Sequence, residues 1–291
     1  MERSDSTIAH TSGTSQERLW APWRMRYVGK RESPPGCIFC SRPASGGPDA
    51  AHLILHRGEH SFVIMNLYPY NTGHVMIVPN AHVPDLDSLD DTALTEMALT
   101  LPRITRTLQR VLDCQGFNIG LNIGAIAGAG VADHLHQHVV PRWHGDVNFM
   151  PVVGQTMVMP ELVPVTYAKV RAELAREYAT EPLSVPVILR SSAGNSILVH
   201  VEGKGWRLPS IEPRAGEPIW RTATNAIDRG QGRIELESIA VLTSASQDRP
   251  LALIFRAMND DNAGSGAFMP LDEARARLPE AERAFLAEAF R

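Results

Sequence analysis

Three histidines, His134, His136 and His138, recur at every second position, and two β-branched valines follow them directly. Side chains alternate between the faces of a β-strand, so a strand here would place all three imidazoles on one face, about 6.6 Å apart. Imidazole can exchange protons, bind a metal ion or attack phosphorus near neutral pH. An accidental surface cluster is the alternative, but a glycine-rich turn precedes the histidines and a core-like Val-Val-Pro follows them. We therefore predict a functional site on this strand.

A pair of cysteines, Cys37 and Cys40, forms a Cys-x-x-Cys motif, and the third cysteine, Cys114, stands alone. Three cysteines do not build a disulfide scaffold, so the pattern indicates a reducing compartment and a metal-binding or redox-active pair. No thioredoxin-like strand precedes the motif, which disfavours redox chemistry. A tetrahedral zinc site needs four ligands, of which this pair would supply two. Two buried thiols without a metal are the remaining alternative.

The composition sets limits on the class of protein. A chain of 291 residues with 44% hydrophobic and 21% charged residues is typical of a soluble globular protein of one or two domains. The net charge is −4 and there is no long basic run, which excludes long nucleic acid as an expected partner. No apolar run reaches membrane-spanning length and no signal-peptide core follows Met1, so we expect no membrane partner and a cytoplasmic location.

Several elements are needed to position the histidines. Residues 1–17 are rich in Ser, Thr and Gly and are expected to be a disordered tail. Residues 61–66 and 74–79 are apolar runs joined by a turn-rich connection, which predicts a β-hairpin. A short amphipathic helix is expected at 167–178, and Glu181-Pro182 has the composition of a linker.

A long helix is predicted between the hairpin and the histidines. Ser88 to Asp91 has the spacing of a capping box, with Asp in place of the usual Glu. From Leu94 to Val111 apolar residues recur every three or four positions, which predicts one buried helical stripe. Pro102 lies inside the stripe and is expected to kink or split the helix.

A glycine-rich loop leads into the histidine segment. Residues 116–124 predict a strand that ends in this loop, with Asn122 near its start. Glycine lets backbone N–H groups approach phosphate oxygens more closely than a residue with a Cβ would allow. The loop is therefore a candidate phosphate-binding loop.

The pattern His-x-His-x-His-Val-Val resembles the histidine triad (HIT) nucleotide-binding family, and the similarity extends upstream over roughly residues 16–180. Asn122 to Gly130 is similar to the family's phosphate loop, Cys37 to Cys40 to its zinc knuckle, and residues 66–79 to its nucleotide strand. Within the family, the segments at 19–24 and 141–146 most resemble the bacterial diadenosine tetraphosphate phosphorylase, or ATP adenylyltransferase, branch.

This resemblance implies an α+β HIT fold, an antiparallel sheet with helices, over residues 18–181. It implies an enzyme that cleaves dinucleoside polyphosphates of the diadenosine tetraphosphate type at the α-phosphate. The reaction would pass through a nucleotidyl-histidine intermediate, which inorganic phosphate or water would resolve. Adenine dinucleotides would be the substrates, and the protein would be a homodimer.

The resemblance also implies roles for individual residues. His136 would be the nucleophile, and His138 would be the second catalytic histidine. The nucleotide would contact Asn66, Phe62, Ile64, Asn122, Gly128 and Gly130. A structural zinc ion would be bound by Cys37, Cys40, His82 and His134.

Some of these roles have alternatives within the same sequence. Phe62 and Ile64 are as readily explained as core residues, and His74 matches a family position that is structural rather than catalytic. The family commonly has Gln, Ser or Thr side chains that touch phosphate just before the histidines. This chain has Ala129, Gly130 and Val131 there, so its contacts with the leaving group must differ.

The second half of the chain, residues 184–291, has a different pattern of predicted strands and helices. Strands are expected at 185–189, 197–201, 237–243 and 251–257, with a helix ending near 229 and an Ala/Glu/Arg-rich helix at the end. This order, and the Trp-x-Leu-Pro at 206–209, resemble the Nudix fold, so a second α/β domain is predicted.

The catalytic residues of that fold are missing here. Nudix enzymes bind magnesium through a run of carboxylates, and the corresponding positions hold Asn225, Ala226, Arg229 and Gly230. Only Glu217, Gly216 and Gly232 remain from the pattern. We therefore predict a degenerate, non-catalytic Nudix-like domain.

Rival functions remain open at this point. Sugar-1-phosphate uridylyl transfer is disfavoured, because that branch typically has His-Pro-His-Pro-Gln where this chain has Leu135, Gln137 and His138. A nucleotide-binding sensor or scaffold, or a hydrolase of other nucleoside phosphate derivatives, is the alternative. The complete set of three histidines favours an enzyme.

Overall fold

The computed structural model describes residues 36–45, 48–146, 161–180, 182–203, 205–231, 233–242, 251–258 and 267–290, with the side chains of 228–231 excluded. The predicted tail at 1–17, the motif at 19–24, Glu181 and Gly232 lie outside the described residues. All described residues fall within one compact unit of the chain. Among their helices, none combines the length and the apolar character that crossing a bilayer requires.

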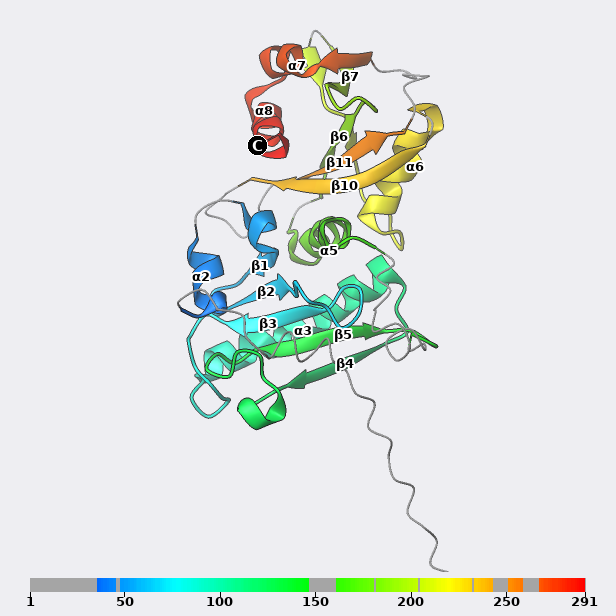
Figure 1. Ribbon diagram of the computed structural model, residues 1–291. Coiled ribbons are helices and arrows are strands. Elements are labelled where there is room, and N and C mark those ends of the chain that lie inside the picture. The colour runs from blue at the N-terminus through cyan, green and yellow to red at the C-terminus, as the bar shows by residue number, and fades with distance from the viewer. Residues whose placement is uncertain are drawn as a thin grey trace, which may run out of the picture. The chain divides into compact units, whose positions relative to one another are not determined.

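His138, the last of the three histidines, belongs to a five-stranded sheet in the described part of the chain, with strand order β1-β2-β3-β5-β4 (Figure 1). All neighbouring strands are antiparallel, and their bounds are β1 Ile54–Arg57, β2 Ser61–Met65, β3 Val75–Pro79, β4 Gly116–Leu121 and β5 Gln137–Arg142. The predicted hairpin is confirmed, because Ser61 pairs with Pro79 and Met65 pairs with Val75.

Both faces of the central strands are covered. Side chains of β2 and β3 alternate between two apolar clusters: Val63, Met65 and Ile77 pack into the main core, and Phe62 and Ile64 into a smaller one. Every residue of these two strands is buried, as expected for strands that are covered on both faces.

Helix α3, Asp91–Leu112, contacts β2, β3 and β5. Its N-cap is Asp90, whose side chain accepts a hydrogen bond from Ala93 N. The predicted capping box that starts at Ser88 is therefore wrong. The expected split at Pro102 is also wrong, because the helix continues through this residue, while the alternative expectation of a kink stays a prediction. Pro102 removes the partner of the Ala98 carbonyl, but both residues are exposed and water can replace the lost bond.

Two short helices precede the sheet. Helix α2, Ile38–Ala44, begins directly after Cys37 and contains Cys40. Its buried residue is Phe39, which joins the small apolar cluster formed by Phe62 and Ile64. A 3-10 helix follows at Asp49–His52.

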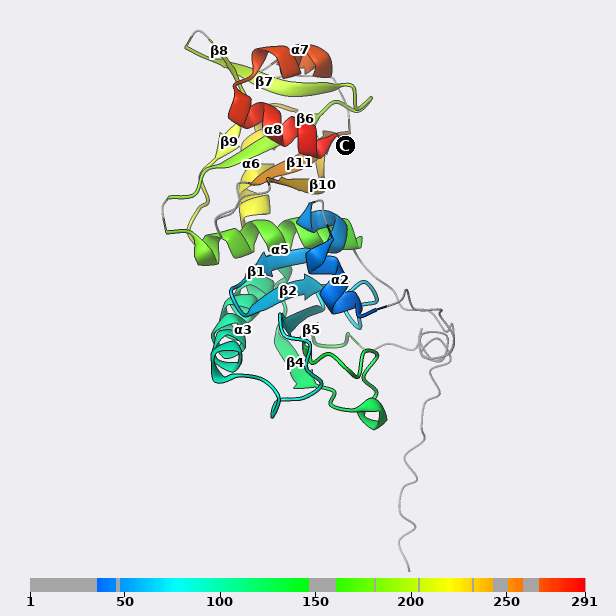
Figure 2. The same cartoon turned by 90° about the vertical axis from the view of Figure 1, so that its left-hand side faces the viewer.

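Helix α5, Val163–Tyr178, is longer than the predicted segment at 167–178. It contacts α3 and β1 and also contacts β10 and α6 of the second sheet region (Figure 2). Its Tyr167 donates a 2.7 Å hydrogen bond from the hydroxyl to the Ile54 carbonyl. One main core therefore includes residues from both halves of the chain.

The second half forms a mixed sheet with strand order β10-β11-β6-β7-β12, with β8 and β9 paired to β7 and β6. The predicted strands are present as β6 Val185–Arg190, β7 Ser196–Glu202, β10 Ile234–Val241 and β11 Leu251–Ala257, with β8 Gly205–Arg207, β9 Ser210–Ile211 and β12 Ala267–Pro270 in addition. Strands β6 and β11 are parallel and the other pairs are antiparallel. Helices α6 Ile219–Gln231, α7 Leu271–Arg277 and α8 Glu280–Ala289 complete this region.

A buried carboxylate links the helices of the two halves. Glu173 of α5 has no exposed surface and accepts hydrogen bonds from Arg110 of α3, at 2.7 Å, and from the backbone N–H of Ile219 in α6, at 2.9 Å. Arg176 pairs with the same carboxylate and donates to the Glu217 carbonyl. Because a buried charge needs partners, this cluster fixes the place of α5 between α3 and α6.

Candidate active site

The three histidines do not all lie on one strand. Strand β5 begins at Gln137, so His134 and His136 lie in the segment before it, and the prediction of a single strand through all three is wrong. The neighbouring β3 ends at Pro79, which has no N–H to extend the ladder. The His134 imidazole bonds the Pro79 carbonyl instead, with 2.9 Å between Nε2 and O.

The protonated nitrogen of His136 is set by the backbone. It is 4% exposed, and its Nδ1 lies 2.8 Å from the His134 carbonyl, to which it must donate. The proton is therefore on Nδ1 and the lone pair is on Nε2. Burial lowers the pKa of His136, although the bond to the His134 carbonyl acts in the opposite direction. The free nitrogen is unprotonated at neutral pH.

His138 has its proton at the opposite nitrogen. The backbone N–H of Tyr70 donates to His74 Nδ1 at 3.1 Å, which requires that His74 is protonated on Nε2. His74 Nε2 lies 2.9 Å from His138 Nδ1 and donates to it, so His138 keeps its own proton on Nε2. Asn122 Nδ2 is 3.5 Å from that nitrogen. His138 and Asn122 therefore face the same space with polar groups.

His74 is neutral because it is fully buried. Its pKa is lowered to about 3, mainly by burial and to a smaller extent by electrostatic repulsion from His138 and His136. A neutral imidazole has one donor and one acceptor, so His74 can fix only one tautomer of His138. The position expected to be structural thus sets which nitrogen of His138 donates.

The side chains predicted to contact the ribose and the base already have partners within the protein. Asn66 Oδ1 accepts from Tyr68 N at 3.0 Å, and Asn66 Nδ2 lies 3.2 Å from His74 Nδ1. Phe62 and Ile64 are buried beside Phe39 in the small cluster. Their contacts with a nucleotide stay predictions.

The glycine-rich loop contains a short 3-10 helix, Ala125–Ala127, between Gly124 and Gly128. Both glycines have positive φ, 78° and 83°. A Cβ would meet nothing within 4 Å at either position, so glycine is required for the backbone conformation and not for space. Val131 packs against the small cluster, in place of a side chain that would reach phosphate. The predicted contacts of Gly128 and Gly130 with the nucleotide stay predictions.

Cys37, Cys40, His82 and His134 come together as a candidate metal site, with one ligand atom from each within 4.8 Å of the others. Cys37 Sγ and Cys40 Sγ lie 3.3 and 3.5 Å from His134 Nδ1. His82 Nδ1 lies 3.2 Å from His134 Nδ1 and 3.3 Å from Cys40 Sγ. A tetrahedral zinc ion with bonds of about 2.0 to 2.3 Å would separate its ligands by about 3.3 to 3.8 Å.

His134 has the hydrogen bond that a metal ligand needs. Its Nε2 is used by the Pro79 carbonyl, which leaves the Nδ1 lone pair directed at the two thiols and at His82. A backbone carbonyl bonded to the second ring nitrogen is the usual support for a metal-bound histidine. The chemistry and the spacing of the donor set fit a zinc ion.

Two aromatic residues of the site were missed by the sequence reasoning. The Phe39 ring centroid lies 4.9 Å from that of His136 and 5.5 Å from that of His134. The Tyr70 ring lies 4.7 Å from His74 and 5.8 Å from His138. Phe39 stands between the two cysteines in sequence, which was the available signal. Tyr70 lies in the connection of the hairpin, a segment whose sequence predicted only a turn.

The loop of Tyr70 is anchored to the end of β5. Asp146 accepts from Arg142 at 2.6 and 2.7 Å and from Asn71 Nδ2 at 2.8 Å. The hydrogen bond with Arg142 lowers the pKa of Asp146 strongly, so the carboxylate is charged throughout the neutral range. This gives the segment at 141–146 a structural role beside the histidines.

Several known proteins are similar in sequence to this chain. A family model described as HIT domain matches residues 49–145. The AP-4-A phosphorylase of Mycobacterium tuberculosis is 38% identical over 172 residues, which is 57% of this chain and 86% of that protein. The bis(5'-nucleosyl)-tetraphosphatase (asymmetrical) of Schizosaccharomyces pombe is 31% identical over 93 residues, which is 32% of this chain and 50% of that protein.

Among solved structures, a Zn-bound histidine triad family protein from Mycobacterium smegmatis is 26% identical. The match covers 50% of this chain and 98% of that one, with a TM-score of 0.41.

The burial of His74 predicts a pH-dependent stability. Because its pKa is about 3 in the folded protein and about 6.5 when unfolded, the unfolded chain binds the proton first as the pH falls. This term is fully present above pH 6.5 and is lost on acidification, by about 2 kcal/mol between pH 7 and pH 5. His74→Phe should lack it, so urea unfolding at both pH values should show a smaller loss for the variant than for the wild type. Equal losses in the two proteins would show that folded His74 binds the proton as readily as the unfolded chain does.

Proposed function

This chain belongs to the HIT family, and on that premise we propose that it cleaves dinucleoside polyphosphates of the diadenosine tetraphosphate type at the α-phosphate. The similarity to the AP-4-A phosphorylase of M. tuberculosis, which this chain covers over 86% of its length, supports the substrate class. The observation that carries the proposal is the pair of opposite tautomers, a free nitrogen on His136 beside an N–H donor on His138. Their ring centroids are 4.9 Å apart.

In the first step, Nε2 of His136 attacks the α-phosphorus. A P–N bond forms, and the P–O bond to the remaining polyphosphate breaks, so the leaving nucleotide departs with the electron pair as an anion. The His138 Nε2–H and the backbone N–H groups of the glycine-rich loop are proposed to stabilise the charge on the phosphoryl oxygens. Asn122 would hold one of these oxygens, beside His138.

In the second step, inorganic phosphate or water attacks the same phosphorus. The P–N bond breaks and its electrons return to His136, which releases ADP when phosphate is the acceptor and AMP when it is water. Asn66 is proposed to contact the ribose, and Phe62 and Ile64 to lie beneath the base. The identity of the product with and without added phosphate decides between phosphorolysis and hydrolysis.

Replacing His136 tests the nucleophile. His136→Ala should abolish turnover of diadenosine tetraphosphate while nucleotide binding is largely retained, because the covalent step disappears but the loop remains. Mixing wild type with labelled substrate and quenching in base should trap adenylate on the protein, and the variant should trap none. His200→Ala, a histidine of β7 in the second sheet, is the matched control and should keep wild-type turnover.

A variant that keeps more than a few per cent of the wild-type rate would remove His136 from this role. Nucleotide binding without turnover or adduct in the wild type would favour a nucleotide-binding sensor or scaffold instead. Turnover confined to other nucleoside phosphates would keep the chemistry and change the substrate.

We propose that Cys37, Cys40, His82 and His134 hold a structural zinc ion. Zinc would tie α2 to the segment that carries His136, because His134 is both a ligand and the acceptor for the nucleophile. It would supply no chemistry at the phosphate.

The purified chain should therefore contain about one zinc ion per subunit, measured by atomic emission. Cys37→Ser or His82→Ala should lower the metal content and the melting temperature, because metal binding adds to the folding free energy. Cys114→Ser, at a buried cysteine outside the site, is the control for loss of a thiol and should keep the metal. Metal-free wild-type protein with an unchanged melting temperature would rule the site out.

We propose that the second half of the chain is a Nudix-like domain without catalysis of its own. Glu217, the remaining acidic residue of the expected motif, uses both carboxylate oxygens within the protein. They accept from Thr222 Oγ1 at 2.9 Å and from Asn225 Nδ2 at 2.7 Å. A carboxylate engaged in this way leaves little capacity for a magnesium ion.

We also propose a homodimer, with β4 as the contact. Among the described residues β4 is an edge strand of the first sheet, and Ile119 on it and Ile123 after it are each 44% exposed. An open edge with exposed apolar side chains favours pairing with a second copy. Ile119→Lys should shift the sedimentation coefficient from that of two chains to that of one. A wild-type protein that sediments as a single chain would refute the contact.

A further inference from the structure

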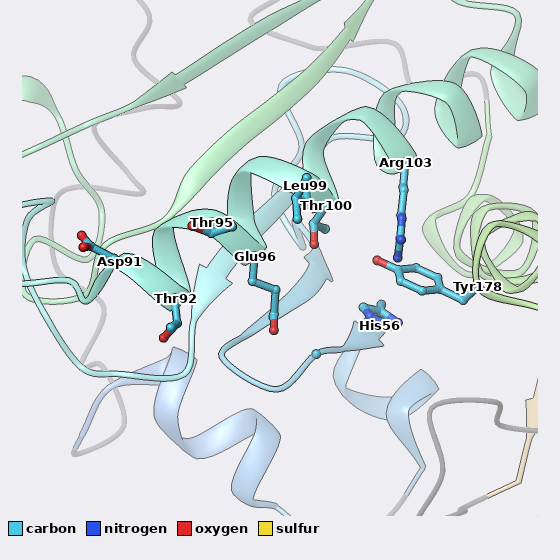
Figure 3. Close-up of a pocket in the computed structure, with 10 residues that line it drawn as sticks. His56, Asp91, Thr92, Thr95, Glu96, Leu99, Thr100, Arg103 and Tyr178 are labelled. Atoms are coloured by element: carbon cyan, nitrogen blue, oxygen red, sulfur yellow. The ribbon is translucent and has the colours of Figure 1, made fainter.

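Beside α3 lies a cavity that forms a second candidate site, the second cavity (Figure 3). Its volume is about 450 Å³, and its walls come from the end of β1, the β1–β2 connection, α3 from Asp91 to Arg103 and the end of α5. No residue of the proposed active site or zinc site lines it. The volume is in the range of small-molecule sites.

One end of the cavity is built around Tyr178. The His56 ring stacks on it, with centroids 3.8 Å apart, and the Arg103 guanidinium lies 4.6 Å from its centroid. Figure 3 shows Arg103 and His56 on opposite sides of the tyrosine ring. The Tyr178 hydroxyl is buried and has no hydrogen-bond partner within the described residues. A buried hydroxyl left without a hydrogen bond is destabilising, so a polar ligand atom here would be favoured.

Arg103 differs from the arginines that follow it on α3. Arg106 pairs with Glu177 at 2.8 Å and Arg110 with Glu173 at 2.7 Å. In the part of the chain that the structure describes, Arg103 has the contact with the Tyr178 ring but no carboxylate at ion-pair distance. Its N–H groups are therefore available, and guanidinium is the group best shaped for binding phosphate or carboxylate.

The acidic residues of the cavity do not neutralise this end. Both oxygens of Glu96 accept from the backbone N–H groups of residues 59–61 and from the Ser61 hydroxyl, so this carboxylate is directed at the β1–β2 connection and does not pair with Arg103. Asp91 is twelve residues from Arg103, about 18 Å along the helix. That distance is about twice the Debye length at physiological salt, so its charge is largely screened at Arg103.

We propose that this cavity is a second binding site, which takes a small organic anion. The anion's phosphate or carboxylate group would lie against Arg103 and the Tyr178 hydroxyl, and its body would lie over Thr95 and Leu99. Leu99 is 63% exposed, which gives the ligand an apolar surface to cover. The site does not depend on the reaction at the histidines, and its ligand need not be the substrate.

Isothermal titration calorimetry on the full-length protein tests this with three probes, used separately: inorganic phosphate, glycerol 3-phosphate and succinate. At least one should bind, and Arg103→Gln should raise its Kd about 10-fold or more, because the substitution removes the charge-assisted hydrogen bonds to the anion. Binding of the phosphates alone would assign a phosphate ligand, and binding of succinate alone a carboxylate ligand.

Arg106→Gln is the matched control, one turn along the same helix and outside the cavity, and should leave the Kd unchanged. Tyr178→Phe keeps the ring and removes the hydroxyl, so it should weaken binding even if Arg103→Gln fails to fold. Thermal melting of each variant checks folding. His138→Ala should leave the probe bound, because the proposed active site is elsewhere.

Three results would overturn the site. One is no binding of any probe up to about 10 mM, the limit of a weak but specific site. The second is binding that is lost in His138→Ala and unchanged in Arg103→Gln, which would place the anion at the histidines. The third is an equal effect of Arg103→Gln and Arg106→Gln, which would indicate only a general loss of positive charge.

Discussion

The hydrogen bond from His136 Nδ1 to the His134 carbonyl is the constraint on which the proposed chemistry depends. It fixes where the lone pair of His136 lies, and it requires that the backbone of His134 does not move. Three contacts of His134 provide that: its Nε2 meets the Pro79 carbonyl, and its Nδ1 faces the two thiols. The proposed zinc site and the proposed nucleophile, His136, are therefore linked through His134. The metal would act only by holding His134, and with it His136, in place.

Helix α5 extends this dependence to the second half of the chain. It shares a core with both sheets, and the buried Glu173 joins it to Arg110 near the end of α3. The same helix ends at Tyr178, which forms one end of the second cavity. The chain after α3 leads through Cys114 into β4 and the glycine-rich loop. The second half of the chain therefore contributes to packing, because removing it would expose one face of the helix that supports the first sheet.

Local pattern in the sequence predicted the elements better than it predicted the site. The hairpin at 61–79 and the helix stripe after Asp90 follow from periodicity, which short-range packing decides. The sequence did not predict that pairing between β3 and β5 stops before His136, because this depends on Pro79 in the neighbouring strand β3. The approach of His82 to Cys40 joins residues 42 positions apart, so only resemblance to a family indicated it. The second cavity depends on Tyr178 reaching Arg103 across two helices, which no local pattern encodes.

The opposite roles proposed for His136 and His138 do not require different intrinsic basicities. Each ring takes its tautomer from a backbone group: the His134 carbonyl accepts from His136, and the Tyr70 N–H reaches His138 through His74. A carbonyl can only accept and an N–H can only donate, so neither end of this arrangement can reverse. His74 transmits the constraint only while it is neutral, and its complete burial keeps it so. The fold thus fixes which nitrogen of each histidine carries the proton before any substrate binds.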